Sequence, residues 1–169
     1  MRRAARIALL VMIALSSLGF IALAAWQLQR LGWKNDLIAR VTQRATGAPA
    51  PMPPPGAWAS VGTADEYRRL RLQGRFEPGH VLVQATTVLG GGFWVLAPLR
   101  LADGTVVLVN RGFVPPEQRG PEQLASPGGS VELIGLLRLT EPTGGPLRSN
   151  VPAEGRWYSR DVAGLAAQL

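Results

Sequence analysis

The stretch Gly104-Thr-Val-Val-Leu-Val-Asn-Arg-Gly-Phe-Val-Pro115 decides the fold that we predict for this chain. Residues 105–109 are all β-branched or leucine, so both faces of an extended segment are apolar, as is typical of a strand buried within a sheet. Asp103-Gly104 before it indicates a hairpin turn, because glycine accepts the positive φ that such turns require. Residues 93–101 supply the partner strand. The sequence therefore predicts a central strand paired as a hairpin.

This strand ends in polar residues. Asn110, Arg111 and Gly112 precede the proline that stops the pairing, a combination that indicates a site. In one interpretation Arg111 reaches a carboxylate on a partner or cofactor. In the other, Asn110 and Gly112 form a β-bulge and Arg111 pairs within the chain, with Glu141 as the candidate partner. We favour the second, because polar groups at a buried strand end need hydrogen-bond partners.

Composition excludes several classes of function. The chain has no cysteine and one histidine, His80, which excludes disulfides, thiolate metal sites and CxxC redox chemistry and argues against a histidine metal site. The net charge of +7 comes from arginines scattered along the chain, without a nucleic-acid-binding motif. We therefore predict no nucleic-acid partner, and we expect the charge to attract anionic lipid.

The N-terminal region predicts a transmembrane helix. Residues 7–29 carry no charge, and roughly 23 residues form a helix of about 35 Å, enough to cross a hydrocarbon core of about 30 Å. Arg2, Arg3 and Arg6 place the N-terminus in the cytoplasm by the positive-inside rule. The alternative is a cleaved signal peptide with Ala22-Leu-Ala24 as its cleavage site. We favour a retained anchor, because tryptophans and cations that suit a membrane interface follow at once.

Downstream, the chain divides into further segments. We predict a cytoplasmic tip and transmembrane helix at 1–29, a juxtamembrane helix at 30–46, a proline-rich linker at 47–65 and a β-rich domain at 66–169. In the β-rich domain, Leu70 and Leu72 alternate with arginines, which predicts a strand with an arginine-rich outer face.

Other segments complete the predicted domain. They are strands at 81–87 and 130–140, a flexible glycine tip at 90–92, a short last strand at 157–160 and a helix capped by Asp161. The predicted fold class is mainly β: an N-terminal transmembrane helix followed by a small antiparallel, barrel-like extramembrane domain with a short C-terminal helix.

Several motifs, in order, resemble one family. Residues 107–115 resemble the signature VLVNRGWVP of the Surfeit locus protein 1 family, and the membrane-exit segment resembles its WQ..R..WK motif through Trp26, Gln27, Arg30, Trp33 and Lys34. Further matches are Tyr67, Gly74, Phe76, the Pro98-Leu-Arg-Leu stretch, Asp103-Gly104, the Gly135-Leu-Leu-Arg138 stretch, Glu141-Pro142, Asn150, Pro152, Trp157 and Asp161.

The resemblance implies an assembly factor and not an enzyme. Its expected client is the catalytic subunit of a haem-copper cytochrome c oxidase, with haem a as a transient cofactor and haem a synthase as a further partner. Members of the family continue into a second membrane helix whose outer end carries a histidine implicated in haem binding. This chain ends at Leu169, so that ligand lies outside it, and we expect His80 to be an exposed turn residue instead.

The candidate site residues follow from these motifs. Trp26, Gln27, Arg30, Trp33 and Lys34 are expected at the depth of haem propionates or lipid phosphates, with plain interfacial anchoring as an equal alternative. Asn110 and Arg111 form the second candidate. The glycines are expected to serve backbone geometry: Gly74, Gly104, Gly112 and Gly135.

Two further hypotheses concern the location of the protein and an alternative function. The short N-terminus favours a bacterial inner membrane with a periplasmic main domain. A membrane-tethered envelope scaffold that binds no haem stays the alternative function.

Overall fold

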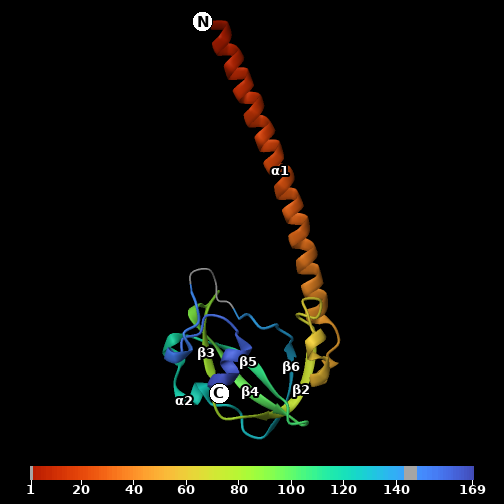
Figure 1. Cartoon of the computed structure of the whole chain (residues 1–169), viewed down its shortest axis with the longest axis vertical. Coiled ribbons are helices and arrows are strands. Elements are labelled where there is room, and N and C mark those ends of the chain that lie inside the picture. Colours follow the sequence, from red (N-terminus) through yellow and green to blue (C-terminus); the bar gives the residue numbers. More distant parts are fainter. Residues whose placement is uncertain (1, 143–147) are drawn as a thin grey trace. The chain divides into compact units, whose positions relative to one another are not determined.

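The computed structural model describes residues 2–142 and 148–169, and the chain forms two compact units, Met1–Thr46 and Gly47–Leu169 (Figure 1). The first unit is a single helix, α1, Arg2–Thr46, which is 45 residues long. It runs without a break through the predicted transmembrane and juxtamembrane segments. This helix is long and apolar enough to cross a membrane.

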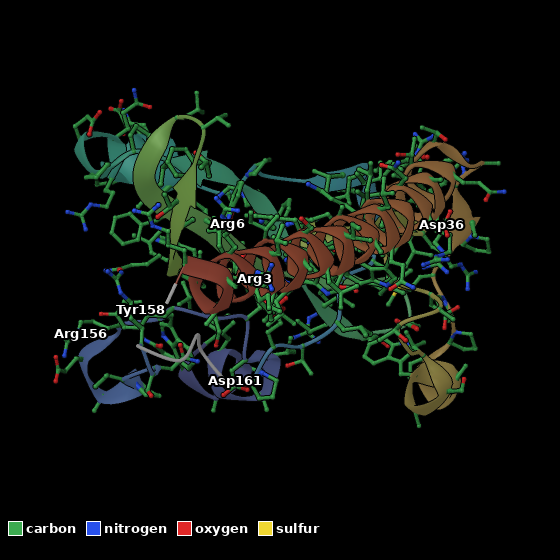
Figure 2. The ribbon with its side chains drawn as sticks, turned by 90° about the horizontal axis from the view of Figure 1, so that it is seen from above. Arg3, Arg6, Asp36, Arg156, Tyr158 and Asp161 are labelled. Atoms are coloured by element: carbon green, nitrogen blue, oxygen red, sulfur yellow. The ribbon has the colours of Figure 1, made fainter. Side chains whose placement is uncertain are left out.

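The charges on α1 are unevenly placed. Figure 2 shows Arg3 and Arg6 near its start and Asp36 further along. The first turn of α1 carries arginines and no acidic residue. The helix dipole favours acidic residues at this end. Arginine at this end therefore does not stabilise the helix, and it suits the flank of a membrane-spanning segment.

The described residues of the second unit contain a sheet of six strands. The strands are β1 Ala50–Pro51, β2 Arg69–Phe76, β3 Val81–Thr87, β4 Gly90–Leu101, β5 Val106–Val114 and β6 Ser130–Leu136. The central strand is β4, which pairs with β3 along its first part, with β2 at its end and with β5 on its other edge. Residues 95–99 are buried, so this strand is enclosed on both faces.

The prediction that β5 is the central strand is therefore wrong. Within the described residues β5 pairs with β4 alone, and none of its residues is fully buried. Both β4 and β5 are apolar in sequence. They differ in the number of strands that pair with them, and this number depends on the tertiary structure.

Two details of the predicted fold class are also corrected. The sheet is mixed, because β1 runs parallel to β2 while the other pairs are antiparallel. The sheet is not closed into a barrel, since the described part of β5 pairs with β4 and that of β6 pairs with β2. Strands dominate only the second unit, because α1 takes 45 of the 169 residues.

The proline-rich segment at 47–65 lies within the second unit. It contains β1 and a 3₁₀ helix, η1 Pro55–Ser60, whose Trp58 donates its indole N–H to the carbonyl of Pro53 at 2.9 Å. Proline is tolerated at the start of a helix, where amide donors have no partner in any case. We expected a spacer here, whereas the structure contains short elements that belong to the sheet unit.

The core is built around Trp157. Its side chain is fully buried with Leu99 and Leu165, and it clusters with Val81 and Val83. Leu165 comes from α3, Val162–Gln168, where the Asp161 side chain accepts a hydrogen bond from the Gly164 amide at 3.2 Å. The predicted N-cap is confirmed.

Residues 157–160 do not form the predicted last strand. Trp157 instead makes one isolated parallel bridge to Val83. The burial pattern of β2 does confirm the predicted arginine face: Leu70 and Leu72 are buried, while Arg71 and Arg75 are exposed.

The segments that follow β5 contain short helical elements. Between β5 and β6 lie a 3₁₀ turn, η2 Pro116–Gln118, and one helical turn, α2 Pro121–Leu124. A third 3₁₀ turn, η3 Pro152–Glu154, precedes α3. The glycines at 90–92, predicted as a hairpin tip, belong to β4, and the turn itself is Val88-Leu89.

Candidate functional site

The membrane-exit motif forms a stripe along α1. At about 100° per residue, Trp26, Arg30 and Trp33 lie within about 60° of one another around the helix axis. The Arg30 guanidinium sits 5.2 Å from the centre of the Trp26 ring, a cation–π contact. Both tryptophans are exposed, at 49% and 63%. Three of the five predicted residues therefore share one surface, which we call the Trp26–Arg30–Trp33 stripe.

The other two residues of the motif lie beside this stripe. Lys34 follows Arg30 by one turn and flanks the stripe, while Gln27 is rotated from Trp26 by about 100°. The stripe combines two flat apolar faces with a guanidinium. Such a surface can hold an anionic group and a planar or acyl surface at the same time.

The Asn110-Arg-Gly motif is a β-bulge within β5, since the pairing with β4 resumes at Phe113 and Val114. Leu96 pairs with Asn110 and Trp94 with Phe113, so two residues of β5 stand opposite the single residue between them on β4. The Asn110 side chain accepts a hydrogen bond from the Gly112 amide at 2.9 Å, and Gly112 has a φ of 121°. The bulge directs Arg111 away from the ladder.

Arg111 binds backbone groups of the chain itself. Its Nη1 donates to the Leu124 carbonyl at 2.8 Å, and its Nη2 donates to the Ala125 carbonyl at 2.6 Å. Its guanidinium also lies 5.6 Å from the centre of the Phe76 ring. Internal pairing was the interpretation that we favoured, but the partners are these carbonyls, whereas Glu141 pairs with Arg138 and Arg160.

An open hollow of about 410 Å³ lies beside this contact. Residues 76–80, Pro121 and residues 124–128 line it, so the segment that Arg111 holds forms one wall. His80 lines it too and is exposed, as expected for this turn. Within the described residues, no cluster of three or more His, Cys, Asp or Glu side chains could hold a metal ion.

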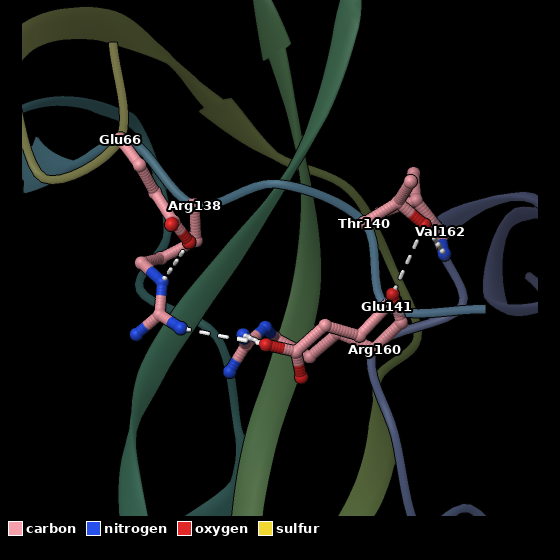
Figure 3. A network of polar contacts seen from close by, with 6 residues as sticks. All are labelled: Glu66, Arg138, Thr140, Glu141, Arg160 and Val162. Carbon is pink, nitrogen blue, oxygen red and sulfur yellow. Dashed lines mark hydrogen bonds and ion pairs between the residues drawn. The ribbon is translucent and has the colours of Figure 1, made fainter. Parts of the chain in front are cut away.

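A polar network joins segments that are far apart in the sequence (Figure 3). Arg138 pairs with Glu66 at 2.9 Å and with Glu141 at 3.5 Å, and Glu141 also binds Arg160. The neighbouring Thr140 hydroxyl accepts from the Val162 amide at 3.1 Å, at the start of α3. The network ties the entry of β2 to the exit of β6 and to α3.

Tyr67 beside this network has an unusual backbone. Its φ is 69°, which is rare for a residue other than glycine, and its amide donates to the Leu137 carbonyl at 2.8 Å. The Arg138 guanidinium covers its ring at 4.6 Å. Conformations of this kind persist only where surrounding contacts enforce them, and here the network does so.

A second ion pair lies near the ends of β2 and β4. The Arg100 guanidinium donates to the Glu77 carboxylate at 2.5 Å, which lowers the pKa of Glu77 and raises that of Arg100. In the β4–β5 turn, the amide of Thr105 donates to Asp103 at 2.9 Å and lowers the pKa of that carboxyl. Asp103 is exposed and Glu77 is partly exposed, so these contacts organise turns without creating a reactive group.

Comparison with known proteins gives the family. The profile described as SURF1 family matches residues 14–169. The chain belongs to the SURF1 family. Surfeit locus protein 1 of Homo sapiens is 33% identical over 165 residues, which cover 85% of this chain and 54% of the human protein. A SURF1-like protein of Monosiga brevicollis is 34% identical over 161 residues, which cover 86% of this chain and 60% of that protein.

A SURF1-like protein of Caenorhabditis briggsae is 31% identical over 182 residues, covering 93% of this chain and 56% of its own length. The chain thus spans about half the length of the curated relatives that it matches. The family resemblance carried by the Asn110-Arg-Gly and Trp26–Lys34 motifs is confirmed.

The four glycines predicted for backbone geometry divide into three cases in this SURF1 family member. A Cβ on Gly74 would lie 2.3 Å from the Arg100 carbonyl oxygen, so close packing requires glycine there. Gly104 and Gly112 have φ values of 84° and 121°, which favour glycine. Nothing in the structure explains Gly135, where the nearest atom to an added Cβ is 3.9 Å away.

Sequence reasoning missed the roles of three side chains that organise the domain, Asn150, Glu66 and Arg138. Asn150 accepts hydrogen bonds from the amides of Tyr158 and Ser159 and donates to the Ser159 hydroxyl. The ion network of Glu66 and Arg138 was missed as well. Single charged residues in turns give no local signal of a partner some 70 positions away, and only their match to family motifs marked some of them.

Proposed function

We propose that this chain is a membrane-anchored assembly factor for a haem-copper cytochrome c oxidase. In this proposal α1 crosses a bacterial inner membrane with its N-terminus in the cytoplasm, and the sheet unit lies in the periplasm. The protein holds the catalytic subunit while cofactors are inserted, or assists the insertion of haem a, and it is not an enzyme. Haem a synthase and anionic lipid are further proposed partners.

Membership of the SURF1 family across residues 14–169 carries this proposal. A tether in the membrane supports it physically, because it confines the search for a membrane-embedded client to two dimensions and raises the effective concentration. The Trp26–Arg30–Trp33 stripe lies where α1 leaves its apolar segment. It is the surface that we propose for contact with the client or the cofactor.

The stripe fits the periphery of a haem and not its iron. Arg30 and Lys34 can pair with propionates, and the indole faces can stack against a macrocycle. The iron needs an axial imidazole, thiolate, thioether or phenolate, and the stripe carries none of these groups. Haem a supplies the redox centre of the client, so in this proposal the residues of the stripe orient and shield it.

Substitution of Trp26 and Arg30 by alanine in cells that lack their own family member tests the proposal. We expect oxidase activity and the haem a absorbance of membranes to fall several-fold while the abundance of the variant is unchanged. Leu28→Ala is the matched control, because Leu28 lies on the opposite side of α1 and is also exposed. Normal oxidase activity in the double variant would contradict the proposal.

A scaffold that binds no haem is the second candidate. The observation that favours it is the outer face of β2 and β6, where Arg71 pairs with Ile134 and Arg69 with Leu136 across the two strands. Ile134 and Leu136 are both 47% exposed, so cations and aliphatic groups share this face. A general envelope defect in the variant with alanine at Trp26 and Arg30, together with normal oxidase activity, would support this candidate.

A further inference from the structure

The tip of the β3–β4 hairpin exposes two adjacent aliphatic side chains. Val88 is 102% exposed and Leu89 is 76% exposed. The turn is held in place, since the Thr87 hydroxyl accepts from the Leu89 amide at 3.1 Å and Gly90 has a φ of 101°. Two-residue hairpin turns favour Asn, Asp and Gly, so two aliphatic residues are unusual in this turn. A single exposed aliphatic residue on a surface needs no explanation. Two together on an ordered, projecting turn indicate a contact.

Two arginines lie behind this tip on one face of the hairpin. Gln84 and Phe93 are cross-strand partners, so their side chains share a face. Arg148 donates to the Gln84 side chain at 3.3 Å, and the Arg119 guanidinium lies 4.9 Å from the centre of the Phe93 ring. In the described part of the chain, neither guanidinium forms an ion pair with a carboxylate.

The spacing of tip and arginines suits a bilayer interface. The Gln84–Phe93 rung lies four residues from Val88, or about 13 Å at about 3.3 Å per residue. Elements that lie in a membrane interface bury their apolar groups about 5–10 Å into the headgroup and acyl boundary. If Val88 and Leu89 lie at that depth, Arg119 and Arg148 lie at the level of the lipid phosphates. A guanidinium forms strong hydrogen bonds with phosphate there.

The neck between the tip and the arginines is narrow and uncharged. Residues 85–87 are Ala, Thr and Thr, and they pair with the glycines at 90–92. Residues 81–95 include no acidic side chain that would be repelled by anionic lipid. Small residues allow the tip to pass between headgroups with little steric cost.

We propose that this hairpin is a second membrane contact, in which Val88 and Leu89 insert into an anionic bilayer and Arg119 and Arg148 bind lipid phosphate. The inference rests on the membrane anchoring by α1 in the proposed function, which keeps a bilayer within reach. A second copy of the chain is a poorer occupant, because it would bring two further arginines of the same charge to the contact.

Site-directed spin labelling of the full chain tests the insertion. The chain contains no cysteine, so Leu89→Cys gives a single labelling site. The matched control is Ala102→Cys, which lies in the polar β4–β5 turn and is exposed. The labelled proteins are placed in nanodiscs of phosphatidylcholine mixed with phosphatidylglycerol, and collision rates with oxygen and with a soluble nickel chelate are measured.

We expect the ratio of oxygen to nickel collisions to be several-fold higher at position 89 than at position 102. The difference should disappear in pure phosphatidylcholine and in the Arg119→Glu, Arg148→Glu double variant. A label at 89 that is as open to nickel as the control, or protected only when an oxidase subunit is added, overturns the proposal. So does protection that needs neither anionic lipid nor the arginines.

A third label separates this inference from the proposed anchoring. Leu18→Cys lies in the apolar part of α1. If the label at 18 is in lipid and the label at 89 is in water, the hairpin inference alone fails. If the label at 18 is also in water, anchoring by α1 fails and the hairpin inference fails with it.

Discussion

Arg111 donates a hydrogen bond to the backbone carbonyl of Leu124 at 2.8 Å, which ties the bulge in β5 to the turn of α2. A second bond reaches Ala125, and the guanidinium also covers Phe76. Carbonyl groups at the end of a helical turn have no partner within the helix. The arginine of the Asn110-Arg-Gly motif therefore satisfies acceptors that would otherwise depend on water.

Arg111→Ala is expected to destabilise the sheet unit by about 1.5–3 kcal/mol, the range for hydrogen bonds from a charged group. Urea unfolding of the full chain in detergent, followed by tryptophan fluorescence, measures this loss. Arg156→Ala is the control, because its pair with Glu154 is exposed on both sides and should contribute less. Unchanged stability together with lost oxidase assembly would instead favour a role for Arg111 in binding a partner.

Trp157→Ala is expected to cost about 3–5 kcal/mol, since it opens a large cavity in the core. The Trp157 side chain is fully buried, and its indole N–H donates to the Gln168 side chain at 2.5 Å. The variant should accumulate poorly and unfold at lower urea concentration. Trp58→Ala provides the comparison, because Trp58 is only partly buried. Equal losses in the two variants would contradict the position of Trp157 as the centre of the core.

Local patterns predicted those features that are decided by neighbouring residues. The alternation of Leu70 and Leu72 with arginines was enough to assign the two faces of β2, since strand side chains alternate. The cap at Asp161 and the bulge at Asn110 and Gly112 involve residues two or three positions apart. Each of these predictions rests on chemistry that is complete within one short segment.

Features that depend on distant partners could not be predicted in this way. The apolar sequences of β4 and β5 are alike, and in the described part of the chain only β4 of the two pairs with strands on both edges. The parallel pairing of β1 involves two residues, too few to leave a pattern. The stripe on α1 was partly predictable, because helical spacing places Trp26 and Trp33 together but cannot show what they bind.

Glu77 gives the sheet unit a defined dependence on pH. The pKa of the Glu77 carboxyl is lowered from 4.5, and the largest cause is the hydrogen bond from Arg100. The folded state therefore binds a proton at Glu77 less readily than the unfolded state does. The stabilisation is therefore present above about pH 4.5 and is lost as the pH falls through the lower folded pKa. We expect Glu77→Gln to lower the melting temperature at neutral pH. In acid, we expect the melting temperatures of the variant and the parent protein to be closer together.

Melting temperatures of both proteins between about pH 3 and pH 7 provide the measurement. Glu117→Gln, which changes an exposed carboxylate in η2, controls for the change in net charge. A constant difference between Glu77→Gln and the parent protein across this range would show that the pair with Arg100 does not stabilise the fold.

Gly74 and Gly135 lie on the paired strands β2 and β6, and alanine should affect them in opposite ways. A Cβ at Gly74 would lie 2.3 Å from the Arg100 carbonyl oxygen, so Gly74→Ala must displace backbone and is expected to cost about 1–3 kcal/mol. At Gly135 the nearest atom is 3.9 Å away, so Gly135→Ala should be neutral or stabilise by up to about 1 kcal/mol through the unfolded state. Urea unfolding of the two variants compares them directly. A loss at Gly135 as large as that at Gly74 would contradict the open surroundings that the structure gives to Gly135.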